Sequence, residues 1–191
     1  MENFDLDTLL GNTELNGVSS SSTGYEELPT GYYLCELEEA TLEKSKTSGK
    51  PMVKFAFKVV QNGIIEVVDE NGDAYKARAP HTKNRKIFKY YILDSEKNVK
   101  TLVSDLLKFE GEEPGTELLG EVLRDDEGKL TRLSTDILLG CLDVVSGSSI
   151  YIKSDTTESK KNPGEKQTWN NLTDWDRVVK LGLLEVPDDS E

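Results

Sequence analysis

The sequence predicts a mainly β domain, a Greek-key barrel with one or two helices, flanked by flexible acidic tails. Segments of strand length recur along the chain and are rich in β-branched and aromatic residues. One leucine-rich segment with helical periodicity interrupts them, so strands and helices do not alternate as a parallel α/β fold requires. Both ends are polar and acidic, and the apolar content of 36% is low for a chain that is compact throughout.

We expect a flexible N-terminal tail over 1–28, one domain over 29–184 and an acidic C-terminal tail over 185–191. A chain of 191 residues suits one substantial domain with tails. The first tail is rich in Ser, Asn and Gly, as flexible linkers are. An apolar stretch near its start leaves open a second reading, a tethered peptide that docks on a neighbouring surface.

The first half of the domain contains five strand signals, rich in Val, Ile, Phe and Tyr. We predict strands at about 31–42, 52–60, 64–68, 74–78 and 85–93. Asn71-Gly72 is the type I′ turn signal of a hairpin that joins the third of these strands to the fourth.

Strand parity predicts which side chains face the core, because successive side chains alternate between the two faces of a sheet. The predicted core face of the second strand is uniformly apolar and consists of Val53, Phe55, Phe57 and Val59. The opposite face, predicted to meet solvent or a ligand, consists of Lys54, Ala56 and Lys58. In 85–93 both faces are mixed, and we assign Arg85, Lys89 and Tyr91 to the outer one.

The second half of the chain predicts one long helix over about 95–109, capped by Asp94 or Ser95. The segment 118–133 is ambiguous, and a hairpin is one reading of it. The remaining predicted elements are a short helix over 134–142, strands at about 148–153 and 166–172, and a helical turn at 178–181. Five or six strands with an inserted helix fit a partly open Greek-key barrel of the OB type.

The net charge of −13 conceals a basic centre between two acidic flanks. Residues 44–100 contain 13 Lys and Arg against 6 Asp and Glu, whereas 1–43 contains 10 acidic residues and no Lys or Arg. Lysines interleaved with aromatic residues on extended segments are typical of single-strand binding, because cations follow phosphates and flat rings stack on bases. The alternative is that lysines on exposed strands serve solubility and protect sheet edges.

No residue pattern indicates catalysis, a metal site or a cofactor. One histidine, His81, and two separated cysteines, Cys35 and Cys141, cannot form a zinc site of the usual type or a nucleophile with its base. We therefore predict no enzymatic activity and no cofactor. The start has no basic region before an apolar run, and no apolar run approaches about 20 residues, so we expect a cytoplasmic protein that does not span a membrane.

The order of several short motifs is informative. They are Pro29-x-Gly31-x-Tyr33, the turn over 44–49, the strand over 54–60, Arg85-x-Ile87-Phe88, the helix over 95–109 and the strand after Gly147 that leads to Trp169. Together they resemble small phage-encoded single-stranded DNA-binding proteins. The resemblance implies an OB-type fold that coats single strands during phage DNA replication and recombination in the host bacterial cytoplasm. It also implies a homodimer and an acidic C-terminus that contacts replication or recombination proteins.

We predict that the basic centre binds single-stranded DNA with little sequence preference. The predicted nucleic-acid-binding residues are Lys54, Lys58, Lys76, Arg78, Lys83, Arg85, Lys89 and Tyr91. We expect the acidic C-terminus, with Asp188, Asp189 and Glu191, to compete with DNA for this surface. The alternative function is an acidic DNA mimic, a phage inhibitor that occupies the basic groove of a host defence protein.

Overall fold

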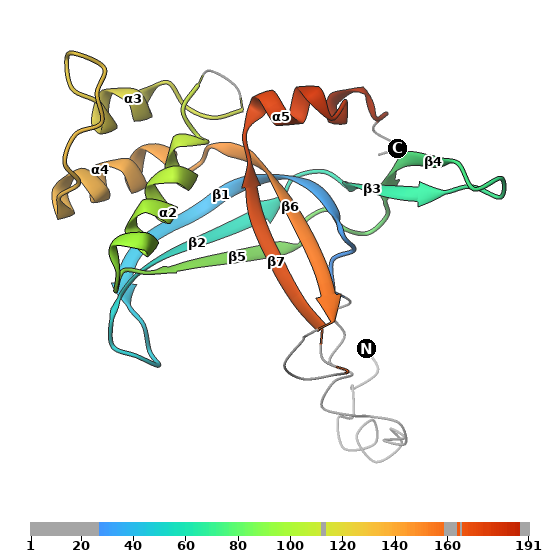
Figure 1. The fold of residues 1–191 in the computed structure, drawn as a ribbon, viewed down its shortest axis with the longest axis horizontal. Helices are drawn as coiled ribbons and strands as arrows, with labels where there is room; N and C mark the ends of the chain where they lie inside the picture. The colour runs from blue at the N-terminus through green and yellow to red at the C-terminus, as the bar shows by residue number, and fades with distance from the viewer. Residues whose placement is uncertain (1–26, 112–113, 159–163, 165, 188–191) are drawn as a thin grey trace, which may run out of the picture.

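The computed structural model describes residues 27–111, 114–158, 164 and 166–187, and it shows a mainly β protein built on a seven-stranded antiparallel sheet (Figure 1). The strands are β1 (Gly31–Lys44), β2 (Pro51–Val59), β3 (Gly63–Val68), β4 (Ala74–Ala79), β5 (Lys86–Ile92), β6 (Ser149–Glu158) and β7 (Lys166–Thr173). The helices are α2 (Glu96–Leu107), α3 (Leu118–Leu123), α4 (Thr135–Val145), α5 (Trp175–Lys180) and the 3₁₀ helix η1 (Leu183–Glu185). Every predicted strand is present, which confirms the mainly β fold.

Strand β1 organises the barrel because it pairs along both of its edges. Its residues from Cys35 onward pair with β2, and its residues from Gly31 to Glu36 pair with β6. The path β5-β2-β1-β6-β7, with the helices α2 to α4 inserted between β5 and β6, is the order of a Greek-key barrel of the OB type. Among the described residues β7 pairs with β6 alone, so the barrel stays open between β7 and β5.

The β3–β4 hairpin is an enlargement inserted between the second and third barrel strands. It projects from the barrel (Figure 1), and its register with β1 is limited to the pair Tyr32 and Ile64. The Asp69 carboxylate organises the tip by accepting the N–H groups of Asn71 and Asp73 at 2.8 and 2.9 Å. The predicted hairpin is therefore confirmed.

The main core lies between the barrel strands and the helices that cover them. Phe55 is at its centre, with ring centroids of Phe57, Tyr91 and Phe109 at 5.8, 5.3 and 6.3 Å in edge-to-face contact. The four β2 residues predicted to be core, Val53, Phe55, Phe57 and Val59, are all fully buried. The parity prediction for β2 is thus confirmed, although Ala56 on its outer face is also buried.

The helix content exceeds the predicted one or two helices, because four α-helices are present among the described residues. Helix α3 occupies the start of the segment that we read as a hairpin. A tight turn does follow it, where the Asp125 carbonyl accepts the Gly128 N–H at 2.8 Å, but one flank of this turn is helical. A helix of six residues is too short to reveal its period in the sequence.

A second, smaller core joins the C-terminal segment to the barrel. Tyr151, Val178 and Leu183 are buried in it, together with Val186. Arg78 fastens the end of this segment, because its guanidinium donates to the carbonyls of Val186 and Pro187, both at 3.0 Å. The packed domain therefore extends past the predicted boundary at 184. Of the tails predicted over 1–28 and 185–191, residues 1–26 and 188–191 lie outside the described residues.

No helix in the described part of the chain combines the length and the apolar composition that crossing a membrane requires.

Candidate nucleic-acid interface

Five side chains project from the outer face of the second and third barrel strands. They are Lys54 and Lys58 on β2 and Lys86, Phe88 and Tyr90 on β5, and we call them the β2–β5 outer face. The register places Lys54 beside Tyr90 and Lys58 beside Lys86. Alternation on a pleated strand then directs all five to the side opposite the core.

The two rings of this face are exposed although nothing in their chemistry favours exposure. Phe88 is 45% exposed and Tyr90 is 54% exposed. Their ring centroids are 6.4 Å apart and their planes are 16° from parallel, and the Lys54 ammonium lies 5.9 Å from the Phe88 centroid. Exposed apolar surface gathered in one place marks an interaction site more often than single exposed residues do.

Carboxylates on β1 balance part of the positive charge on the β2–β5 outer face. Lys54 forms an ion pair with Glu39 at 3.2 Å, and Lys86 forms one with Glu38. The hydrogen bond that Lys54 donates to Glu39 raises the pKa of Lys54. Both carboxylates are substantially exposed, and exposed ion pairs of this kind stabilise by only about 0–1 kcal/mol. An incoming phosphate can therefore take the place of these glutamates at small cost.

The side of β5 that carries Lys89 and Tyr91, which we predicted to be the outer one, faces the barrel interior and its seam. Tyr91 is 4% exposed, and its hydroxyl donates to the Asp105 carboxylate at 2.7 Å. Lys89 points to the same side and donates to the carbonyl of Asn170 at 2.7 Å. Parity misled here because Phe88 and Tyr90 made the outer face as aromatic as the inner one.

The buried side of β5 takes part in a cluster that spans the open seam of the barrel. We call Lys89, Tyr91, Asp105 and Lys108 the Asp105 cluster. Asp105 lies on α2 with 5% exposure, and it accepts from Tyr91 and from Lys108 at 2.7 Å each, with Lys89 at 3.4 Å. Lys108 also donates to the Leu172 carbonyl of β7 at 2.9 Å. Two lysines thus bind β7 where no backbone ladder joins it to β5.

Burial, and next the negative charge of Asp105, raise the pKa of the Tyr91 hydroxyl far above its usual value. The hydroxyl therefore stays protonated and donates to the carboxylate throughout the physiological range. The side of β5 that carries Lys89 and Tyr91 therefore stabilises the fold.

The remaining predicted residues lie elsewhere. Arg78 is occupied by the carbonyls of the C-terminal segment and by that of Asn62 at 2.9 Å, so it fastens the fold. Lys76 is exposed on β4, and Lys83 is exposed in the loop after that strand. Arg85 is half-buried, and its carbonyl accepts the Val59 N–H at 2.9 Å. The eight predicted residues therefore do not form one surface.

The sequence reasoning missed Lys86, Phe88 and Tyr90. Their common signal is a spacing of two residues that matches Lys54 and Lys58 on the neighbouring strand. This signal becomes readable only when the β2–β5 register is known, because the same segment also contains an apolar pattern of the opposite parity.

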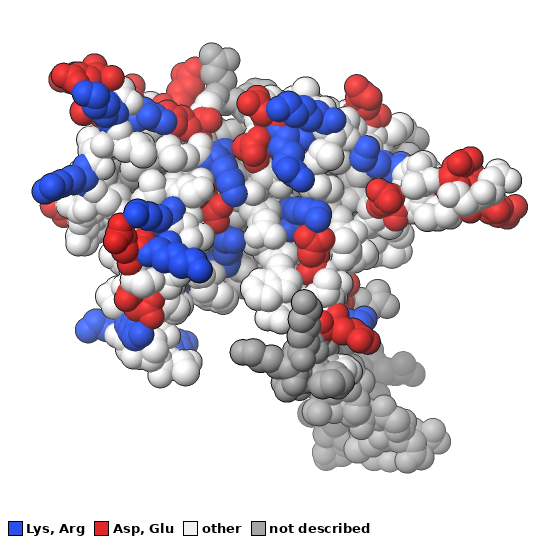
Figure 2. All heavy atoms as spheres, in the orientation of Figure 1, with Lys and Arg blue, Asp and Glu red and all other residues white. Residues whose placement is uncertain are grey.

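Charge on the described surface is mixed. Figure 2 shows blue Lys and Arg side chains interspersed with red Asp and Glu side chains, and the free end of the β3–β4 hairpin is red. On the face that Figure 2 shows, the positive side chains therefore do not form one continuous patch.

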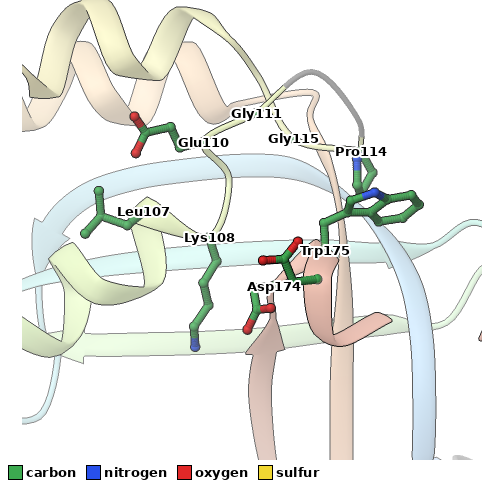
Figure 3. Close-up of a pocket in the computed structure, with 9 residues that line it drawn as sticks. Leu107, Lys108, Glu110, Gly111, Pro114, Gly115, Asp174 and Trp175 are labelled. Carbon is green, nitrogen blue, oxygen red and sulfur yellow. The ribbon is translucent and has the colours of Figure 1, made fainter. Parts of the chain in front are cut away.

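A pocket of about 560 Å³ lies between the end of α2 and the start of α5 (Figure 3). Two of its three carboxylates have structural partners. Glu110 accepts from Arg124 at 2.6 and 2.8 Å, a hydrogen bond that lowers the pKa of Glu110. Asp174 caps α5 by accepting the Arg177 N–H at 2.9 Å. Among the described residues, no group of three or more His, Cys, Asp or Glu side chains is arranged to hold a metal ion.

No family model matches the chain, and no curated protein matches it in sequence. The resemblance to phage single-stranded DNA-binding proteins therefore stays a prediction, and the function has to be argued from the geometry.

Proposed function

We propose that the protein binds single-stranded DNA on the β2–β5 outer face with little sequence preference. The proposal rests on one observation, the exposed and nearly parallel rings of Phe88 and Tyr90 beside the Lys54 ammonium. Bound in this way, a single strand is protected during phage DNA replication and recombination in the host bacterial cytoplasm. The protein acts as a binder and not as an enzyme.

The rings provide a stacking platform. Residues two apart on a strand are separated by about 6.8 Å, so both rings face one strand of DNA laid along β5. Stacking of a base on an aromatic side chain contributes about 1–3 kcal/mol, and every base has a flat face that can stack. This chemistry binds single strands without reading their sequence, since in a duplex the base faces are covered by neighbouring base pairs.

The lysines on either side of the rings supply the electrostatic part of binding. Lys54 lies beside Tyr90, and Lys58 and Lys86 lie beside each other two residue pairs beyond Phe88. For single strands each neutralised phosphate contributes about −0.7 to the slope of log K against log salt. Three phosphate contacts on this face therefore predict a slope of about −2.

The fold supports the same surface. In OB-type barrels the face of the second and third strands is the one that holds oligonucleotides. Here those strands are β2 and β5, which present the exposed rings.

Fluorescence anisotropy tests the proposal, with labelled oligo-dT and labelled duplex DNA at two salt concentrations. We expect tighter binding to oligo-dT and weaker binding at high salt. The double variant Phe88→Ala with Tyr90→Ala should lose about 2 kcal/mol or more, roughly thirty-fold in affinity. Tyr75→Ala is the matched control, because Tyr75 is 51% exposed but lies on the β3–β4 hairpin. Equal or stronger duplex binding would refute the proposal. Binding to neither DNA at low salt would also refute it and would favour the acidic DNA mimic.

The partners of the protein follow from the same proposal. The acidic C-terminus docks replication or recombination proteins, and two copies form a homodimer. Light scattering of the purified protein measures its mass in solution, and a monomeric mass would exclude the homodimer.

A further inference from the structure

The side of β5 opposite the rings borders a second charged surface. A groove of about 650 Å³ runs between α2 and the seam of the barrel. We call it the α2 groove, and it is lined by Lys89, Glu96, Lys97, Lys100, Thr101, Ser104, Asp105, Lys108 and Asn171. It has four lysines against two carboxylates and no aromatic residue. Its composition therefore differs from that of the β2–β5 outer face.

The lysines of the groove are only partly balanced. Lys89 and Lys108 share the single carboxylate of Asp105. Lys100 pairs with Glu96 at 2.5 Å, but both side chains are more than 70% exposed, so this pair is screened by water. Lys97 makes no ion pair with any residue that the structure describes. Ordinary salt bridging therefore leaves positive charge in the groove.

The other donors in the groove are suited to phosphate oxygens. Ser104 and Asn171 are exposed polar side chains on opposite sides of it, from α2 and from β7. Contacts to nucleic-acid backbones come mainly from Lys and Arg together with Ser, Thr and Asn side chains. A groove with these donors and no ring can bind phosphates but cannot stack bases.

The groove also lies where a single DNA strand would continue after it leaves the rings of Phe88 and Tyr90. Strand β5 ends at Ile92, two residues after Tyr90, and α2 begins at Glu96. The short connection between them contains Asp94, which forms an ion pair with Lys50 at 2.8 Å. Lys50 ends the β1–β2 turn, so it adds a cation between the two surfaces. In Figure 2 blue side chains gather around α2, which lies in front of β1, β2 and β5 in Figure 1.

We infer that the α2 groove is a second binding site, for the sugar–phosphate backbone of a single strand whose bases stack on Phe88 and Tyr90. This inference rests on the proposed function and assigns the path of the strand beyond β5. The first contact uses about 14 Å of β5 from Lys86 to Tyr90, and the groove uses about 16 Å of α2 from Lys97 to Lys108. A short oligonucleotide therefore occupies the rings alone, and a longer one occupies both surfaces.

The test compares oligo-dT of about 5 nucleotides with oligo-dT of about 15, lengths within the range that one OB-type fold covers. The variant is Lys97→Glu with Lys100→Glu, two exposed positions at the start of α2 where acidic residues are compatible with the helix. The matched control is Lys129→Glu with Lys180→Glu, which changes the net charge equally at two other exposed lysines.

We expect the groove variant to bind the longer oligonucleotide roughly ten-fold more weakly at moderate salt. The slope of log K against log salt concentration should be less steep by about 1.4, which corresponds to two lost phosphate contacts. Its affinity for the shorter oligonucleotide and both affinities of the control variant should stay within about two-fold of the wild type. Equal weakening for both lengths, equal weakening in the control, or an unchanged affinity for the longer strand would overturn the inference alone. A wild-type protein that binds neither oligonucleotide would instead overturn the proposed function.

Discussion

Tyr90 and Tyr91 are neighbours in sequence with opposite environments. Tyr90 is 54% exposed on the β2–β5 outer face, whereas Tyr91 is 4% exposed in the Asp105 cluster. Lys86 and Lys89 differ in the same way. Lys86 pairs with an exposed glutamate, whereas Lys89 contacts Asp105 and the carbonyl of Asn170 at the seam of the barrel. Residue type alone therefore does not identify an interface. On β5 the same two residue types contact the seam of the barrel on one side and face solvent on the other.

The largest expected effect is a difference in stability between alanine variants of the two tyrosines. Tyr91→Ala removes a buried ring from contact with Phe55 and takes away one of the hydrogen-bond donors to the buried Asp105 carboxylate, so it should lower the free energy of unfolding by about 3–5 kcal/mol. Tyr90→Ala should change it by no more than about 0.5 kcal/mol. Urea denaturation followed by circular dichroism measures both. Similar losses in the two variants would show that the faces of β5 are assigned wrongly.

Charge reversal at Lys89 and at Lys54 should also have different effects, and the expected change in stability is smaller than for the tyrosines. Lys89→Glu places a carboxylate beside Asp105 and removes the donor to Asn170, so we expect a loss of about 2 kcal/mol in stability. Lys54→Glu should leave stability nearly unchanged and weaken oligo-dT binding, because it reverses a charge beside the rings. Denaturation and anisotropy on both variants test this. A stable Lys89→Glu protein would show that the seam does not depend on this lysine.

At alkaline pH the Tyr91 hydroxyl should contribute an effect of about 1 kcal/mol on stability. Burial and Asp105 raise the pKa of the Tyr91 hydroxyl in the folded state above its unfolded value. Its contribution to stability is therefore fully present below about pH 10 and is lost as the pH rises further. Between pH 8 and pH 11 the wild type should lose about 1 kcal/mol more than Tyr91→Phe does. Parallel pH profiles of the two proteins would contradict this assignment.

The smallest expected effect concerns the acidic C-terminus. Asp188, Asp189 and Glu191 carry the negative charge that we expect to compete with DNA for the basic surface. Deleting 188–191 should tighten binding of oligo-dT a few-fold at low salt, through a contact of on the order of 1 kcal/mol that salt screens. Anisotropy at two salt concentrations measures the gain. An unchanged affinity at low salt would leave the tail only its proposed role in docking partners.

Prediction succeeded where one segment contained the whole signal. The β2 core face is uniformly apolar and was predicted correctly, and the hairpin around Asn71-Gly72 is present as well. Its turn is not the predicted type I′, because Gly72 has a positive φ of 89° and Asn71 does not. It failed where the deciding partner was distant. Arg78 appeared to be a cation for DNA, but its acceptors are carbonyls more than 100 residues away.

The sequence by itself determined the strands, the long helix and the inward face of β2, because local propensity and a clean period of two specify these. Only the tertiary structure decided which side of β5 faces the solvent. Both sides of that strand offer rings and lysines, so its orientation depends on the register with β2, on Asp105 from α2 and on the carbonyls of β7. A buried tyrosine needs an acceptor for its hydroxyl, and only Tyr91 finds one, which leaves Phe88 and Tyr90 outside.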